Sequence, residues 1–355
     1  MRAILLGGGL ALLISLLGTR VAISQFTKLG YGQEIREDGP TTHLSKRGTP
    51  TMGGVVIVLA TVIAYFAARL ITGIQPSTSA LLLLFLFVGT ALVGFLDDFI
   101  KIFRQRNLGL RSRAKFIGQT IVAVVFGVLA LWHKLADDRG RQAASHQISF
   151  LRDWGPTLPT ILVIVVIWFL VTGFSNAVNL TDGLDGLATG ACALVFAAYT
   201  IISIWQSNQS CGRTINAKCY LVRDPLDLAV VAACITGACI GFLWWNASPA
   251  KIFMGDTGSL ALGAALAGFA VLSRTEILLI LLGGLFVIET LSVMLQVGFF
   301  KVSKGKRIFK MAPIHHHFEM LGWEQVTVVI RFWIITGLCV AVGVGVFYAE
   351  WVAGN

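Results

Sequence analysis

The sequence predicts an all-α integral membrane protein with about ten transmembrane helices, and two observations support this fold class. Only 13% of the 355 residues are charged and 56% are hydrophobic, whereas soluble domains carry about 25% charged residues. This composition excludes a soluble enzyme, a nucleic-acid-binding domain and a disordered chain as first interpretations. Ten apolar windows are also long enough to cross a hydrocarbon core of about 30 Å as helices. They lie near residues 3–19, 51–68, 77–96, 116–132, 156–174, 186–206, 228–244, 257–273, 277–300 and 332–349.

The distribution of positive charge predicts how these helices are oriented. The chain carries 28 Lys and Arg residues against 18 Asp and Glu residues, and most of the cations lie in loops that follow odd-numbered windows. The positive-inside rule places these loops in the cytoplasm and, because the number of windows is even, both termini outside it. We expect a single polytopic domain over residues 1–355.

Two cysteines, Cys211 and Cys219, flank a polar segment in one of the outer loops. An oxidising compartment would permit a disulfide between them, and a pair of free thiols is the alternative. The sequence alone leaves both open.

Five polar clusters fall in the loops on the cytoplasmic side. The first is KRGTPTMGG, residues 46–54. Its cations, hydroxyls and glycines suit a phosphate site, because backbone N–H groups can approach an anion closely there. A positively charged membrane anchor with a Gly-Pro turn is the alternative interpretation.

The second cluster is GFLDDF, at the cytoplasmic end of the third window. The adjacent carboxylates of Asp97 and Asp98 repel each other at a hydrocarbon boundary, so they need a cation or a shared proton. A divalent metal is the simplest partner. The alternative is a solvated helix end paired with Lys101.

The third and fourth clusters are NAVNLTDGLDGL, residues 176–187, and NASPAKIFMGDTGS, residues 246–259. In the third, Asn and Asp side chains beside glycines could contact a sugar or a base, or could form an Asx-rich connection between helices. In the fourth, Asp256 could ligate a metal or cap the next helix, and Phe253 could stack on a base.

The fifth cluster is PIHHHFE, after the ninth window. Three consecutive His residues cannot share one helix face, but in an extended segment His315 and His317 would project to the same side. Near neutral pH such side chains can bind a phosphate, relay a proton or bind a metal. A solvated loop with incidental His residues is the alternative.

Together the clusters supply carboxylates for a divalent metal, cations and His for phosphates, and amides for a nucleoside or sugar. These groups suit phosphoryl transfer at a membrane surface, with an active site on the cytoplasmic face. The sequence contains no Walker A motif, so it gives no support to ATP-driven transport.

The ordered motifs GTPTMGG, GFLDDF, NLTDGLDGL, NASPAKIFMGDTGS and PIHHHFE, between residues 48 and 319, resemble those of the phospho-N-acetylmuramoyl-pentapeptide transferases. This is a branch of the polyprenyl-phosphate N-acetylhexosamine-1-phosphate transferases. The resemblance implies transfer of phospho-MurNAc-pentapeptide from UDP-MurNAc-pentapeptide to undecaprenyl phosphate, giving lipid I and UMP. It also implies Mg²⁺ as cofactor, the bacterial inner membrane as location, a role in peptidoglycan synthesis and a homodimeric state.

The same resemblance assigns expected roles by motif position. An acidic centre with an essential His comprises Asp97, Asp98, Asp256 and His315, with Asp256 and Asp98 as metal ligands. Substrate-binding positions are Lys46, Thr51, Asn179, Asp182, Gly183, Leu184, Asp185, Asn246, Phe253, His316 and His317. These roles suggest a one-step mechanism in which Asp97 removes the proton from the lipid phosphate and that phosphate attacks the sugar-linked phosphorus. A two-step route through an Asp nucleophile is the alternative.

Two other functions remain open at this point. A sister transferase could move another sugar phosphate, such as GlcNAc-1-phosphate from UDP-GlcNAc, although the His run in PIHHHFE favours the muramoyl branch. The second alternative is a transporter or channel. The feature that best supports it is Glu289 in the ninth window, because an intramembrane acid can serve an ion pathway. A buried, hydrogen-bonded role for Glu289 is the alternative. The clusters on one face, away from the midplane, favour the enzyme.

Overall fold

The computed structural model describes residues 1–30, 48–103, 109–212 and 218–352. Within these residues, ten helices are long and apolar enough to cross a membrane, which confirms the predicted fold class. They are α1 (Arg2–Lys28), α2 (Gly54–Thr72), α3 (Thr78–Phe103), α4 (Ser112–Ala130), α5 (Thr160–Thr181), α6 (Leu187–Asn208), α7 (Pro225–Asn246), α8 (Gly255–Leu272), α10 (Gly284–Val302) and α12 (Gln325–Val352). Shorter helices are η2 (His133–Leu135), α9 (Leu278–Leu282) and α11 (Ile314–Glu319).

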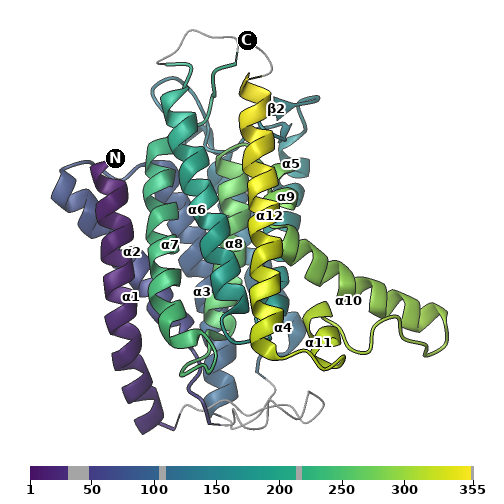
Figure 1. The fold of residues 1–355 in the computed structure, drawn as a ribbon. Helices are drawn as coiled ribbons and strands as arrows, with labels where there is room; N and C mark the ends of the chain where they lie inside the picture. Colours follow the sequence, from purple (N-terminus) through teal and green to yellow (C-terminus); the bar gives the residue numbers. More distant parts are fainter. Residues whose placement is uncertain (31–47, 104–108, 213–217, 353–355) are drawn as a thin grey trace.

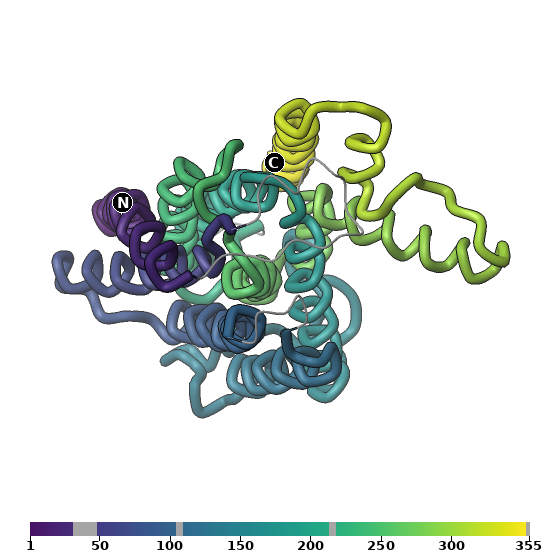
Figure 2. Tube along the Cα trace, turned by 90° about the horizontal axis from the view of Figure 1, so that it is seen from below, coloured from purple at the N-terminus to yellow at the C-terminus, as the bar shows by residue number. Residues whose placement is uncertain are grey.

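Helix α8 lies inside the bundle, where it contacts α3 and α5 most extensively (Figure 2). All its residues from Thr257 to Leu272 are buried. Two glycines allow the neighbouring helices to approach its first turn. A Cβ atom at Gly94 of α3 would overlap the carbonyl of Asp256, and one at Gly54 of α2 would overlap the backbone of Gly258. Such small residues permit close contact between helix backbones, so the start of α8 is held between α2 and α3.

The ninth apolar window is not one continuous helix. It divides at Gly283 into α9 and α10, and α10 then points away from the bundle (Figures 1 and 2). A Cβ atom at Gly283 would lie 2.9 Å from the ring of Phe174, and one at Gly284 would lie 2.7 Å from the sulfur of Cys339. Adjacent glycines are common at sharp changes of helix direction, and here the close packing also requires them.

Helix α1 begins and α12 ends at the same end of the bundle (Figure 1). The same end carries a short antiparallel pair, β1 (Ile148–Ser149) and β2 (Asp153–Trp154). Cys211 and Cys219 form a disulfide in the structure, which decides between the two alternatives left open by the sequence. The described polar clusters that follow odd-numbered windows lie at the opposite end.

Candidate functional site

Three carboxylates meet where the end of α3 approaches the beginning of α8. Asp97 and Asp98 come from α3, and Asp256 is the second residue of α8. One oxygen of each lies within 4.8 Å of the others. Asp97 and Asp98 are each only 3% exposed. Carboxylate oxygens are preferred ligands of hard divalent cations, so this cluster could bind a metal ion.

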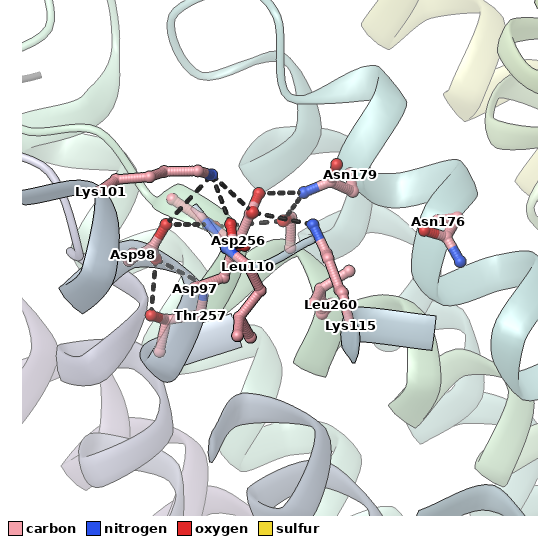
Figure 3. Close-up of polar contacts among 12 residues, drawn as sticks. Asp97, Asp98, Lys101, Leu110, Lys115, Asn176, Asn179, Asp256, Thr257 and Leu260 are labelled. Atoms are coloured by element: carbon pink, nitrogen blue, oxygen red, sulfur yellow. Dashed lines mark hydrogen bonds and ion pairs between the residues drawn. The ribbon is translucent and has the colours of Figure 1, made fainter. Parts of the chain in front are cut away.

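Two lysines offset part of the negative charge of the three carboxylates (Figure 3). The ammonium of Lys101 lies 2.6 Å from Asp97 Oδ2 and 2.7 Å from Asp256 Oδ2. The ammonium of Lys115, from α4, also lies 2.8 Å from Asp256 Oδ2. The alternative interpretation, a solvated helix end paired with Lys101, is wrong in part: Asp97 and Asp98 do pair with Lys101, but they are buried.

The side chain of Asp98 also caps the N-terminus of α8. Its Oδ1 accepts the N–H of Asp256 at 3.1 Å, and its Oδ2 accepts the N–H and the hydroxyl of Thr257 at 2.9 and 2.7 Å. The first N–H groups of a helix have no partner inside the helix and favour a negative charge. Asp98 therefore caps α8 from another helix, while the side chain of Asp256 faces the lysines.

An amide from the last turn of α5 completes the surroundings of Asp256. Asn179 donates from Nδ2 to Asp256 Oδ1 at 2.5 Å and to Ser259 Oγ at 2.8 Å. Asn176, one turn earlier, lies apart from the cluster and donates to Gln119 Oε1 at 3.1 Å (Figure 3). The third motif therefore contributes Asn179, and not Asn176, to the acidic centre.

The residues after α5 form a turn beside the same cluster. Asp182 ends the helix, and burial, with the negative charges of Asp256 and Asp98, raises the pKa of its carboxyl well above the usual range. Asp185 is buried and accepts the N–H of Ala250 at 3.1 Å. This contact ties the turn to the segment that precedes α8. Gly183 and the buried Leu184 lie between the two acids.

The loop before α8 is held by hydrogen bonds between its backbone groups and two partners outside it, the side chain of Asn246 and the segment before α2. Asn246 is buried, accepts the hydroxyl of Thr189 at 2.9 Å and donates to the carbonyl of Ile252 at 2.9 Å. Phe253 is half-buried, and its N–H donates to the carbonyl of Pro50 at 2.8 Å. Asn246 thus orients the loop from inside the protein.

The buried hydroxyl of Thr51 lies beside Gly255, as does the carboxylate of Asp98. The first motif therefore reaches the acidic cluster through Thr51. Lys46, the other residue expected from that motif, lies outside the described residues.

The His segment is a short helix, α11, so the expectation of an extended segment is wrong. The rings of His315 and His316 lie 4.2 Å apart, with Nε2 of each close to Gly183, whereas His317 lies against Lys310. His315 is fully buried and its Nδ1 lies 3.0 Å from Glu289 Oε1. Nδ1 of His316 lies 2.7 Å from Glu319 Oε2, and Nδ1 of His317 accepts the N–H of Lys310 at 3.1 Å.

Comparison with known proteins places this arrangement in a family. The profile of glycosyl transferase family 4 matches residues 80–274, and the phospho-N-acetylmuramoyl-pentapeptide-transferase signature 1 matches residues 46–58. A phospho-N-acetylmuramoyl-pentapeptide-transferase from a Nocardioides species is 72% identical, with 100% of both chains covered. Those of Kineococcus radiotolerans and Cutibacterium acnes are 60% and 59% identical, again over 100% of both chains. The chain belongs to the phospho-N-acetylmuramoyl-pentapeptide transferases.

Four residues at the centre of this transferase were not assigned to its site from the sequence. They are Lys101, Lys115, Thr257 and Ser259. The sequence indicated Lys101 only as the partner of the acids at a solvated helix end, although it follows Asp97 by four residues on a helix, a spacing that brings side chains together. The role of Lys115 depends on how α4 packs beside α3, which the local sequence does not specify.

Proposed function

We propose that this chain transfers phospho-MurNAc-pentapeptide from UDP-MurNAc-pentapeptide to undecaprenyl phosphate, forming lipid I and UMP for peptidoglycan synthesis. The observation that carries the proposal is the cluster of Asp97, Asp98 and Asp256 at one end of a membrane bundle, close to lysines and to an amide. The names and full-length similarity of the relatives support the same activity. Residues 1–355 would act as one unit.

Mg²⁺ is the proposed cofactor, held by Asp256 and Asp98 with Asp97 beside them. The donor set suits it, because it consists of carboxylate oxygens and lies close to where substrate phosphates are expected. Asp98 retains acceptor capacity, since each carboxylate oxygen has two lone pairs. When bound, the ion would supply charge neutralisation for the diphosphate and for the departing UMP.

The protein's own residues would position the reactants and move one proton. Asp97 would take the proton of the lipid phosphate, and the backbone N–H of Leu110, 2.7 Å from its Oδ1, holds that carboxylate in place. Lys101 would turn from the carboxylates toward phosphate oxygens, because its side chain is long and 34% exposed. A two-step route with an Asp nucleophile is the alternative.

The remaining expected residues would form the nucleotide and sugar pocket. Thr51 and Lys46 would contact phosphates, and Phe253 would stack on the uracil. His315 would act as a catalytic residue beside the bound sugar. The rest of the pocket would comprise Asn179, Asp182, Gly183, Leu184, Asp185, Asn246, His316 and His317.

We further propose that the protein lies in the bacterial inner membrane. Its acidic cluster would face the cytoplasm, and both termini would lie on the opposite side of the membrane. The disulfide at the end where α1 begins supports this orientation, because disulfides persist in oxidising compartments. Replacing Cys211 with Ser would free the thiol of Cys219. A membrane-impermeant maleimide should then label this thiol in intact spheroplasts, and labelling only after lysis would indicate the opposite orientation.

A homodimer is proposed from the family alone.

UMP release by the purified protein tests the proposal directly. The reaction should require UDP-MurNAc-pentapeptide, undecaprenyl phosphate and Mg²⁺ together, and EDTA should stop it. Formation of product from UDP-GlcNAc, with none from the muramoyl substrate, would favour the sister transferase. Substrate flux in vesicles without UMP release would instead favour a transporter.

The assignment of Asp97 has its own test. Asp97→Asn should abolish turnover, whereas Asp137→Asn should not, because Asp137 pairs with Arg141 outside the membrane-spanning helices. Normal turnover by Asp97→Asn would rule out an essential base at this position.

A further inference from the structure

A buried acid from the displaced helix α10 meets the first His of α11. Glu289 and His315 both have side chains that are 0% exposed, and Glu289 Oε1 lies 3.0 Å from His315 Nδ1. Glu289 is in the second turn of α10, directly after the break at Gly283. The change of direction at Gly283 therefore determines where this carboxylate lies.

The far side of the imidazole is buried without a partner. Nε2 of His315 has no hydrogen bond within the described residues, and neither has Oε2 of Glu289. Nε2 of His315 points toward Gly183: a Cβ atom added at Gly183 would overlap this nitrogen. The same Cβ atom would lie 3.3 Å from Nε2 of His316. Gly183 lies in the turn between Asp182 and Asp185. A buried, unsatisfied nitrogen thus faces the proposed substrate pocket.

A neutral imidazole carries its proton on one nitrogen only, and the hydrogen bond at one nitrogen sets the state of the other. A carboxylate at Nδ1 favours the tautomer with Nδ1–H, so that Nε2 keeps a free lone pair. The carboxylate also fixes the plane of the ring. Leaving a buried polar atom unsatisfied costs free energy, which is recovered when a ligand supplies the missing donor.

We propose that Glu289 is a positioning residue for His315: it accepts Nδ1–H and thereby presents Nε2 as a hydrogen-bond acceptor to the substrate beside Gly183. This inference rests on the proposed function of the same site. Glu289 itself does not touch the substrate. Helix α10 therefore supplies the carboxylate, Glu289, that orients the imidazole of His315.

Histidine labelled with ¹⁵N in the purified full-length protein tests the tautomer without any turnover. The His315 resonance, assigned by its loss in His315→Asn, should show the proton on Nδ1 in the wild type. In Glu289→Gln it should move to Nε2, because the amide can donate to Nδ1. A wild-type proton on Nε2 would overturn the proposal, whether or not Glu289→Gln folds.

Kinetics test the consequence for the reaction. Glu289→Gln should lower kcat at least about tenfold, with KM for UDP-MurNAc-pentapeptide within about twofold, because orientation and not binding is lost. Thr290→Val, the neighbouring position on α10, is the matched control and should keep wild-type kinetics. Unchanged kcat in Glu289→Gln would overturn the proposal.

A double-variant cycle separates positioning from general structural damage. In a His315→Asn background, Glu289→Gln should have little further effect, since its role passes through His315. An undiminished loss in that background would overturn the proposal. Failure of the proposed function can be distinguished from failure of this inference. If the proposed function is wrong, the wild type releases no UMP, but the ¹⁵N spectrum still reports the tautomer of His315.

Discussion

The ammonium of Lys101 lies 2.7 Å from Oδ2 of Asp256, among the three carboxylates that could bind a metal ion. Lys101 also lies 2.6 Å from Asp97 and 3.9 Å from Asp98. It stabilises the buried acids, because clustered carboxylates in a site of low polarity need a nearby cation. A metal ion bound by the same oxygens must therefore compete with it.

Replacing Lys101 with Met should separate these two effects. Without Mg²⁺ the variant should unfold at a lower temperature than the wild type, since the carboxylates lose their internal cation. The Mg²⁺ concentration that gives half of the maximal thermal stabilisation should fall about tenfold, which corresponds to ~1.4 kcal/mol. Thermal unfolding in detergent across a Mg²⁺ titration measures both. Lys304→Met, an exposed position after α10, is the control; equal Mg²⁺ midpoints in all three proteins would contradict competition.

The close contact of α3 with α8 predicts a sharp effect at Gly94. A Cβ atom there would overlap the carbonyl of Asp256, so Gly94→Ala should displace a proposed metal ligand. We expect turnover to fall by up to about 100-fold and the free energy of unfolding to fall by about 1–3 kcal/mol. Gly337→Ala should change neither, because nothing lies within 4 Å of a Cβ atom at that position. UMP release and chemical unfolding of both variants check this, and wild-type behaviour of Gly94→Ala would refute the packing argument.

The number of spanning helices could be predicted from the sequence because lipid requires long apolar segments. The division at Gly283 could not, because adjacent glycines also lie inside a continuous helix, as at residues 7–9 of α1, and the packing against Phe174 and Cys339 that accompanies the break is not visible in the sequence. The acidic pair was visible because adjacent carboxylates at a hydrocarbon boundary are unusual. The contact between Glu289 and His315 could not be predicted, because it joins residues of separate helices whose directions depend on that break.

A buried acid at the end where α1 begins predicts a pH-dependent stability. Glu276 lies between α8 and α9, and its Oε2 accepts the N–H of Ser149 at 3.1 Å. Burial raises the pKa of this carboxyl from 4.5 to about 8, although the charge of Arg274 opposes the shift. The folded protein then holds the proton more tightly than the unfolded chain. This group's contribution to stability is therefore largest at low pH and is lost as pH rises toward about 8.

Replacing Glu276 with Gln should remove this dependence and keep a neutral acceptor for Ser149. The melting temperature of the wild type should fall relative to that of the variant between about pH 5 and about pH 8, and the difference should then stay constant. Thermal unfolding at matched ionic strength measures it. Parallel curves for the two proteins over the whole range would show that Glu276 is ionised in the folded state.

The disulfide between Cys211 and Cys219 predicts a loss of stability without a loss of activity. In the chain-entropy account, a bridge that closes a loop of this length contributes about 2–3 kcal/mol by restricting the unfolded chain. The double variant Cys211→Ser, Cys219→Ser should therefore melt at a lower temperature. It should release UMP at the wild-type rate, because the acidic cluster lies at the other end of the bundle. Reductant should lower the melting temperature of the wild type to that of the variant and leave the variant unchanged; an equal decrease in both would mean that the bridge is not the cause.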